Sequence, residues 1–145
     1  MIYVDTSVLA AYYCPEPLSA RAQRVLQEEQ DLALSSLVEV ELVSALARKV
    51  RARQMRLGDG RRVHATFVAH LDQGMFIRLA VHSLHFAKAH EWLATFRIPL
   101  RTLDALHVAV AAVEDAILVT ADAALAAACG KVGVTARLIT PAAQD

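Results

Sequence analysis

The chain has 145 residues, enough for one domain over residues 1–145, whereas two domains would each be too small to bury a good core. Hydrophobic residues make up 56% of it and the mean hydropathy is +0.36, so some apolar surface could also be buried between subunits. The 15 basic and 15 acidic residues cancel, which argues against a globally basic nucleic-acid-binding protein and requires any cationic surface to be local.

Apolar runs separated by turn residues divide the chain into strands and helices. The first half is predicted to contain, in chain order, strand 2–4, helix 8–13, helix 19–30, strand 32–34 and helix 37–55. Pro15 and Pro17 end the first helix, and Ser19 is expected to cap the second. The second half is predicted to contain a helix that follows a break at Gly58 and Gly60 and runs to residue 73, then strand 76–81, helix 83–95, helix 102–114, strand 117–119, helix 122–129 and strand 137–139.

This alternation predicts an α/β fold with a mostly parallel sheet, because a crossover helix returns each strand in the same direction. In such sheets, ligands bind beyond the carboxyl ends of the strands. Asp5 follows the first strand and Asp122 follows strand 117–119, so both acids are expected at the same edge. The alternative is that each carboxylate only caps the helix that follows it.

Two further acids lie on helices with extensive apolar faces. Ser36 to Glu39 has the pattern of a capping box, which gives Glu39 a structural role. Glu41 instead lies beside an apolar stripe, where a charged carboxylate is costly unless a cation or donors compensate it. Asp104 is in the first turn of the most apolar helix, one turn before His107, which we interpret as structural support. The alternatives are a surface position for Glu41 and a capping role for Asp104.

Four carboxylates near one sheet edge need a counterion, because without one they repel each other and raise each other's pKa values. Hard oxygen ligands favour Mg²⁺ or Mn²⁺ over Zn²⁺. A site of this kind is typical of metal-dependent phosphodiesterases. One rival is a phosphatase that uses Asp5 as a covalent nucleophile, which Ser7 disfavours because it stands where a second acid is common. The other is a non-catalytic module that keeps the fold.

Four segments closely resemble PIN domains of the VapC toxin type, in the same order and across essentially the whole chain. They are YVDTSVL at 3–9, ELVSAL at 41–46, LDALHVA at 103–109 and LVTAD at 118–122. The resemblance implies a three-layer α/β/α fold with a short central parallel sheet of about five strands. It also implies a Mg²⁺- or Mn²⁺-dependent endoribonuclease that leaves a 5′-phosphate and a 3′-hydroxyl, acting as the toxin of a type II toxin–antitoxin system.

The resemblance assigns roles to individual residues. The catalytic quartet is Asp5, Glu41, Asp104 and Asp122. Asp5, Asp104 and Asp122 hold the metal directly or through water, and Glu41 completes the site or orients the attacking water. The secondary positions are the hydroxyl residues Thr6, Ser7 and Thr120. The implied partners are a cognate VapB-like antitoxin, an RNA substrate and a second copy of the chain.

Seven basic residues lie between positions 48 and 62 against a single acid, so this is the segment where a local cationic surface is expected. Candidate RNA contacts here are Arg48, Arg51, Arg53 and Arg56. The alternative is a solvated helix end with cations near its carboxyl terminus. Farther on, His82 and His85 have a spacing compatible with zinc, with His90 nearby, but the absence of cysteines or a matching acid cluster argues against a zinc site.

The compartment is predicted from three features. Cys14 and Cys129 have no redox or metal-ligand spacing, as expected for free thiols in a reducing compartment. The residues after Met1 lack the basic start of a secretory signal. The longest apolar stretch, 105–113, is too short to cross a bilayer. We therefore expect a cytoplasmic protein without membrane association.

Overall fold

The structure, a computed structural model, describes residues 1–141, which form five strands and seven helices. The strands are β1 (Ile2–Val4), β2 (Leu32–Ser35), β3 (Ile77–Leu79), β4 (Ile117–Thr120) and β5 (Ala136–Leu138). The helices are α1 (Thr6–Tyr13), α2 (Ser19–Glu28), α3 (Ser36–Arg51), α4 (Leu57–Asp72), α5 (Ser83–Leu93), α6 (Thr102–Val113) and α7 (Ala123–Lys131).

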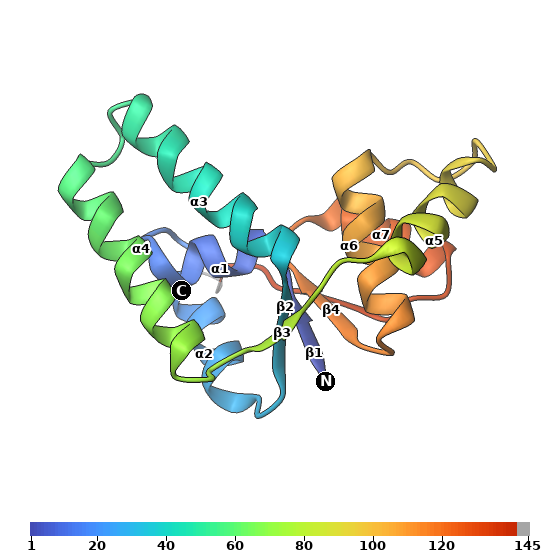
Figure 1. Cartoon of the computed structure of the whole chain (residues 1–145), viewed down its shortest axis with the longest axis horizontal. Helices are drawn as coiled ribbons and strands as arrows, with labels where there is room; N and C mark the ends of the chain where they lie inside the picture. Colours follow the sequence, from blue (N-terminus) through green and yellow to red (C-terminus); the bar gives the residue numbers. More distant parts are fainter. Residues whose placement is uncertain (142–145) are drawn as a thin grey trace.

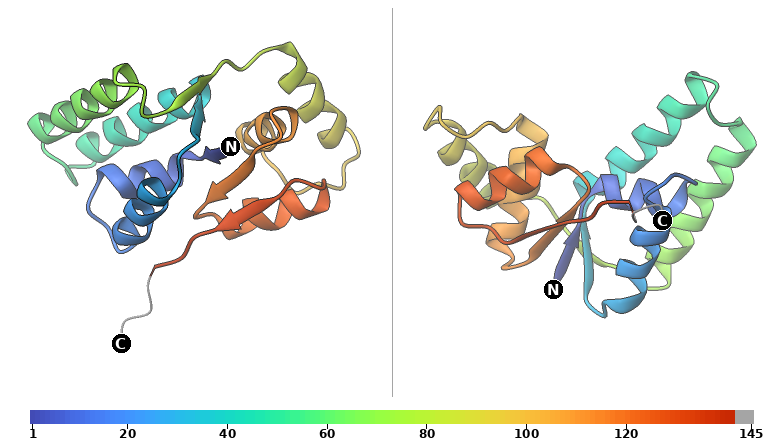
Figure 2. Two further views of the ribbon diagram at one scale, coloured as in Figure 1. Left: turned by 90° about the horizontal axis from the view of Figure 1, so that it is seen from below. Right: turned by 180° about the vertical axis from the view of Figure 1, so that it is seen from behind.

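The five strands form one sheet in the order β3-β2-β1-β4-β5, and every neighbouring pair is parallel. Helices α1 to α4 lie on one side of the sheet and α5 to α7 on the other, as Figures 1 and 2 show. This arrangement confirms the predicted three-layer α/β/α fold. The chain moves outward from β1 through β2 to β3, then returns to the other side of β1 with β4, so the strand order reverses between β1 and β4.

The core lies on both faces of the central strands. All residues of β1 and β2 are buried, as expected for parallel strands covered by helices on both sides. Helix α6 is buried from Ala105 to Ala111, which explains why its sequence is apolar on nearly every face. No helix within residues 1–141 is long and apolar enough to span a membrane.

The expected break at Gly58 and Gly60 is wrong, because both glycines lie inside the first turns of α4. Helix α3 ends earlier than predicted, at Arg51, and the chain turns at Arg53, whose φ of 58° is left-handed. Gly60 has a packing role, since a Cβ added there would meet Val50 Cγ2 of α3 at 3.0 Å. The glycine therefore lets α3 and α4 approach closely, and the turn between them is made by other residues.

Two predicted helix caps are also wrong. The N-cap of α3 is Ser35, whose side chain accepts a hydrogen bond from the Val38 N–H, so Ser36 does not begin a capping box. Glu39 instead pairs with Arg78 of β3 through two hydrogen bonds of 2.8 and 2.9 Å. Ser19 is the first residue of α2 and not its cap, since its hydroxyl donates to the Cys14 carbonyl of the preceding turn.

Candidate active site

Asp5 is the residue at which β1 ends and α1 begins. Its Oδ1 accepts hydrogen bonds from the Ser7 N–H at 3.0 Å, the Val8 N–H at 3.3 Å and the Ser7 hydroxyl at 2.5 Å. Its Oδ2 accepts a hydrogen bond from the Thr120 hydroxyl at 2.6 Å. The residue is only 5% exposed, so these donors take the place of water around the carboxylate. Asp5 thus caps α1 and also joins β1 to β4.

Asp122 lies at the carboxyl end of β4, beside Asp5 in the network. The Thr120 hydroxyl that donates to Asp5 accepts the Asp122 N–H at 2.9 Å. Ser7 makes a second link, because its hydroxyl accepts the Ala121 N–H at 2.9 Å. Asp122 caps α7, and its Oδ1 accepts from two backbone N–H groups of the first turn. The capping interpretation of both acids is therefore correct, and it coexists with their position at the reversal of strand order.

Glu41 is held by a chain of buried polar side chains that crosses the sheet. Its carboxylate is hydrogen-bonded to His107 Nε2 of α6. His107 Nδ1 is 2.8 Å from the Tyr3 hydroxyl of β1, which is 2.7 Å from the Ser35 hydroxyl at the end of β2. With the Nε2 proton directed at the carboxylate, Tyr3 donates to His107 and Ser35 donates to Tyr3. Each side chain in this series then has a hydrogen-bond partner, and the His107 ring fixes the orientation of the Glu41 carboxylate.

Asp104 is in the first turn of α6 and is partly buried. The N-cap of this helix is Arg101, so Asp104 does not cap it. Burial raises the pKa of Asp104, and the negative charges of Asp122 and Glu41 raise it further. Electrostatic interactions with His107 and Arg101 lower it. Asp104 is therefore close enough to Asp122 and Glu41 for their charges to act on its pKa.

The four acids thus come from four elements and lie at one edge of the sheet. Burial raises the pKa of Asp5, and the hydrogen bonds from Ser7 and Thr120 only partly oppose this. Both Asp5 and Asp104 therefore have carboxylates whose charge is disfavoured in the protein alone. A bound cation would relieve this cost.

The donor set fits a hard divalent cation such as Mg²⁺ or Mn²⁺, because its groups offer carboxylate and hydroxyl oxygens. The Thr6 hydroxyl, next to Asp5 in the chain, is buried and has no hydrogen-bond partner within residues 1–141. No three carboxylates of the quartet come within 4.8 Å of one another in the described part of the chain. Mg²⁺ keeps several waters in its coordination shell and takes few carboxylates directly.

The predicted basic segment forms the end of α3 and its turn into α4. Arg48, Arg51, Arg53 and Arg56 are all exposed. Figure 1 shows that the hairpin of α3 and α4 extends away from the sheet. Arg48 lies two turns after Glu41 on the same face of α3, about 10 Å along the axis, whereas Arg53 and Arg56 lie at the far tip. Of the four arginines, Arg48 is therefore nearest to the acidic edge.

Sequence reasoning did not include Tyr3, Ser35 or His107 among the site residues, although His107 was interpreted as structural support. The structure places His107 in direct contact with Glu41 and leaves it only 2% exposed. The available signal was a lone histidine in an otherwise apolar helix, since such a residue needs a hydrogen-bond partner. Nothing in the sequence pattern indicates that Tyr3 is the residue that supplies it.

Comparison with known proteins identifies both a family and a fold. The family model for the PIN domain matches residues 2–131. No curated protein sequence matches the chain significantly. Among solved structures, VapC20 from Mycobacterium tuberculosis, a Sarcin-Ricin loop cleaving toxin, has a TM-score of 0.72 and 22% identity, covering 88% of this chain and 95% of that one.

Two further structures have similar folds. FitAcB from Neisseria gonorrhoeae has a TM-score of 0.68 and 19% identity, covering 94% of this chain and 96% of that one. VapBC2 from Rickettsia felis, bound to a DNA fragment from its promoter, has a TM-score of 0.69 and 15% identity, covering 95% of this chain and 98% of that one. At these identities the similarity concerns the fold.

The buried hydrogen-bond chain leads to a prediction for stability. Tyr3→Phe removes the hydroxyl that lies between Ser35 and His107, so the buried Nδ1 of His107 loses its donor and the Ser35 hydroxyl, which still accepts the Val38 N–H, loses its acceptor. We expect a loss of about 1–3 kcal/mol in the free energy of unfolding, measured by urea denaturation. The matched control is Tyr12→Phe, since the Tyr12 ring packs on Tyr13 without a hydrogen bond from its hydroxyl to the described residues. Equal stability of Y3F and Y12F would contradict the inferred chain.

The raised pKa of Asp5 leads to a second prediction. With EDTA at pH 7, Asp5→Asn should raise the melting temperature by about 2–4 °C, because Asn can cap α1 without a buried charge. The folded-state pKa lies above the ordinary value, so ionisation destabilises the wild type as pH rises through that raised pKa. Below the ordinary pKa of 3.8 the penalty is absent. The difference in melting temperature between Asp5→Asn and the wild type should therefore shrink as the pH falls toward 4.

A control for this measurement is Asp31→Asn, which changes an exposed acid and should alter stability little at any pH. A D5N protein less stable than wild type at pH 7 would show that the hydrogen bonds of the carboxylate outweigh the cost of burying its charge.

Proposed function

The chain belongs to the PIN-domain family, and from this premise we propose that it is a Mg²⁺- or Mn²⁺-dependent endoribonuclease that hydrolyses RNA phosphodiester bonds. The observation that carries the proposal is the convergence of four carboxylates, two of them with raised pKa values, where the strand order reverses. Ligand sites of open α/β sheets lie at this kind of switch point. The similarity in fold to a toxin that cleaves the Sarcin-Ricin loop supports RNA as the substrate.

The residues of the site have three tasks in this proposal. Asp5, Asp104 and Asp122 hold the cation, directly or through water. Glu41, oriented by His107, positions the attacking water and accepts its proton, since its carboxylate is fixed and partly open to solvent. When bound, Mg²⁺ or Mn²⁺ acts as a Lewis acid that polarises the scissile phosphate and stabilises the leaving oxygen.

The hydroxyl residues support this arrangement. Ser7 and Thr120 donate to the two oxygens of Asp5 and fix the direction of its lone pairs. The Thr6 hydroxyl, which is buried and has no partner among the described residues, would gain one if a metal-bound water entered beside Asp5. The arginines at the end of α3 follow the RNA backbone, with Arg48 as the contact nearest the reacting phosphate.

We also propose that the chain is the toxin of a type II toxin–antitoxin pair, inhibited by a VapB-like antitoxin. Several solved neighbours are toxin–antitoxin complexes. An open groove of about 330 Å³ between α3 and α4 is lined mainly by apolar side chains, including Val43, Leu46 and Val50. Val40 of α3 is 69% exposed. Apolar surface of this kind is suited to a protein partner.

A homodimer in the cytoplasm completes the proposal. Other apolar side chains, such as Phe86 and Leu84 of α5, are more than half exposed and offer a surface for a second copy. Both cysteines are buried free thiols, as expected in a reducing compartment. One PIN domain formed by the whole chain is sufficient for these assignments.

The test of the proposed activity is cleavage of end-labelled single-stranded and structured RNAs with Mg²⁺ or Mn²⁺. Asp104→Asn should lower the rate by about 100-fold or more while the protein stays folded, because the acid is lost from the site without a change in shape. EDTA should have the same effect on the wild type. The products should carry 5′-phosphates, which separates this hydrolysis from cleavage by contaminating ribonucleases that use the RNA 2′-hydroxyl.

The matched control is Asp115→Asn, an exposed acid outside the quartet whose left-handed φ of 51° is well tolerated by Asn. This variant should cleave like the wild type. Cleavage by D104N at the wild-type rate, or cleavage that EDTA does not reduce, would refute the assigned site.

The position of Arg48 gives a prediction for RNA binding. The logarithm of the RNA association constant falls linearly with the logarithm of the salt concentration. In a D104N background, Arg48→Gln should make this slope shallower by about 0.7, the value for one phosphate contact with a single strand. Arg24→Gln, on α2, is the control and should leave the slope unchanged. Fluorescence anisotropy with a labelled single-stranded RNA measures both. If the two variants have the same slope as D104N alone, Arg48 does not contact a phosphate.

A further inference from the structure

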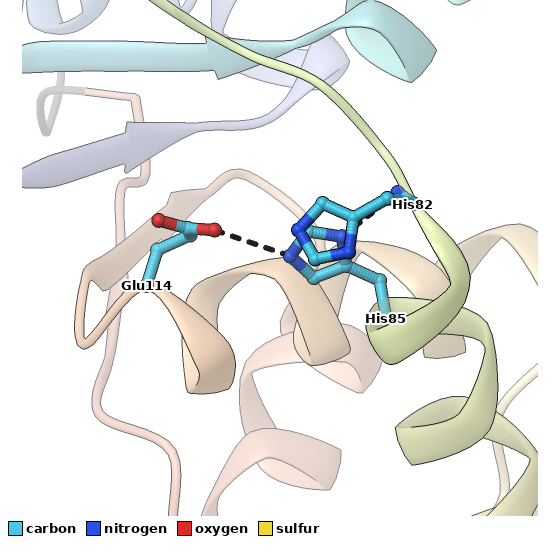
Figure 3. A group of neighbouring side chains, drawn as sticks. All are labelled: His82, His85 and Glu114. Atoms are coloured by element: carbon cyan, nitrogen blue, oxygen red, sulfur yellow. Dashed lines mark hydrogen bonds and ion pairs between the residues drawn. The ribbon is translucent and has the colours of Figure 1, made fainter.

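A second group of possible metal ligands lies outside the acidic quartet, where α5 begins and α6 ends. His82 is the N-cap of α5, His85 is in its first turn and Glu114 is the C-cap of α6. Each offers a ligand atom, and these atoms all lie within 4.8 Å of one another. Figure 3 shows the Glu114 carboxylate directed at the His85 ring, with the His82 ring lying over it. From these positions we propose that the three residues bind Zn²⁺.

The spacing of the group is compatible with a tetrahedral ion. His85 Nε2 and Glu114 Oε1 are 3.3 Å apart. This is longer than a typical charge-assisted hydrogen bond of about 2.7–2.9 Å. It equals the distance of about 3.3 Å between two ligands of a tetrahedral Zn²⁺ with bonds of about 2.0–2.1 Å. The His82 and His85 rings, with centroids 4.1 Å apart, then supply two nitrogens, and water supplies the fourth ligand.

The chemistry of these ligands separates the group from the acidic quartet. Two imidazoles with one carboxylate favour Zn²⁺, whereas carboxylate and hydroxyl oxygens favour Mg²⁺ or Mn²⁺. Asp104 and Glu114 are at opposite ends of α6, ten residues or about 15 Å apart. Glu114 is the acid that the sequence pattern of His82 and His85 lacked, and His90, predicted as a neighbour, is not part of the group.

Zinc binding requires one change of hydrogen bonding. His85 Nδ1 accepts the His82 N–H at 3.1 Å, so its ring proton is on Nε2 and faces Glu114. When Zn²⁺ binds Nε2, the ring proton moves to Nδ1, so the neutral ring keeps one proton and none is released. The Nδ1 proton then faces the backbone N–H of His82, two donors 3.1 Å apart, so the start of α5 has to turn this N–H away from the ring when the metal binds. His82 is exposed, so the ion can reach the group from solvent.

The bound ion would tie the start of α5 to the end of α6. These helices pack side by side, and the connection between β3 and α5 ends at His82 (Figure 3). Because the unfolded chain does not hold the three ligands together, Zn²⁺ should stabilise the folded protein. Occupancy of the site can therefore be measured through the stability of the folded protein, without any reference to RNA cleavage.

The test is a calorimetric titration of Zn²⁺ into untagged protein that has been freed of metal by chelation, in excess Mg²⁺ so that the acidic edge does not compete. The wild type should bind one Zn²⁺. His82→Asn and Glu114→Gln each remove a ligand while preserving the helix cap and the hydrogen bond to His85. Each should weaken binding by about tenfold or more. The control, His90→Ala, removes an exposed histidine of α5 outside the group and should bind like the wild type.

Nitrogen-15 NMR of the histidine rings gives an independent readout. On addition of Zn²⁺, His85 should change from the Nε2–H to the Nδ1–H tautomer, and the melting temperature should rise in the wild type and in H90A. Absence of Zn²⁺ binding by the wild type overturns the proposal, as does unchanged affinity in H82N and E114Q. An unchanged His85 tautomer in the zinc-loaded protein overturns it too, because the ion would then be bound elsewhere.

Discussion

The carboxylate of Asp5 is the group on which the arrangement of this edge depends. It is buried where β1 ends, and it accepts hydrogen bonds from the first turn of α1 and from Thr120 at the end of β4. The same residue therefore begins a helix and joins the two strands between which the strand order reverses. Because one oxygen is directed by backbone groups and the other by a hydroxyl, the carboxylate has little freedom to turn.

A second set of contacts fixes the position of α3 and α6 relative to the sheet. Ser35, Tyr3 and His107 connect β2, β1 and α6 in series, and the last member reaches Glu41 on α3. Each group in the series depends on its direct neighbours for a hydrogen-bond partner, which makes the arrangement specific. It also explains why an apolar helix contains a histidine. The ring provides the polar link that an aliphatic side chain at position 107 would lack.

The sequence was sufficient to predict the order of strands and helices, because short apolar runs alternate with longer periodic segments. The four acids were singled out for a different reason: they lie beside apolar stripes or at strand ends, and they match the motif positions of the family. The details of the caps and turns were less predictable. Gly60 was interpreted as a break because its contact with Val50 depends on the packing of α3 against α4, which periodicity does not describe. Glu39 is likewise paired with a strand that lies 39 residues further on.

Helix α6 shows how one element can serve two kinds of site. Its buried middle fixes the helix against the sheet, which leaves its two ends as the positions where charged groups can reach solvent. Asp104 at the first end lies near the carboxylates of Asp122 and Glu41, with His107 and Arg101 also close, and Glu114 at the other end lies near two imidazoles. In the two proposed sites, carboxylates of one helix would therefore hold different metals because their neighbours differ. Because α6 is packed along its buried middle, an ion bound at Glu114 would restrain the same helix that positions Asp104, without entering the acidic edge.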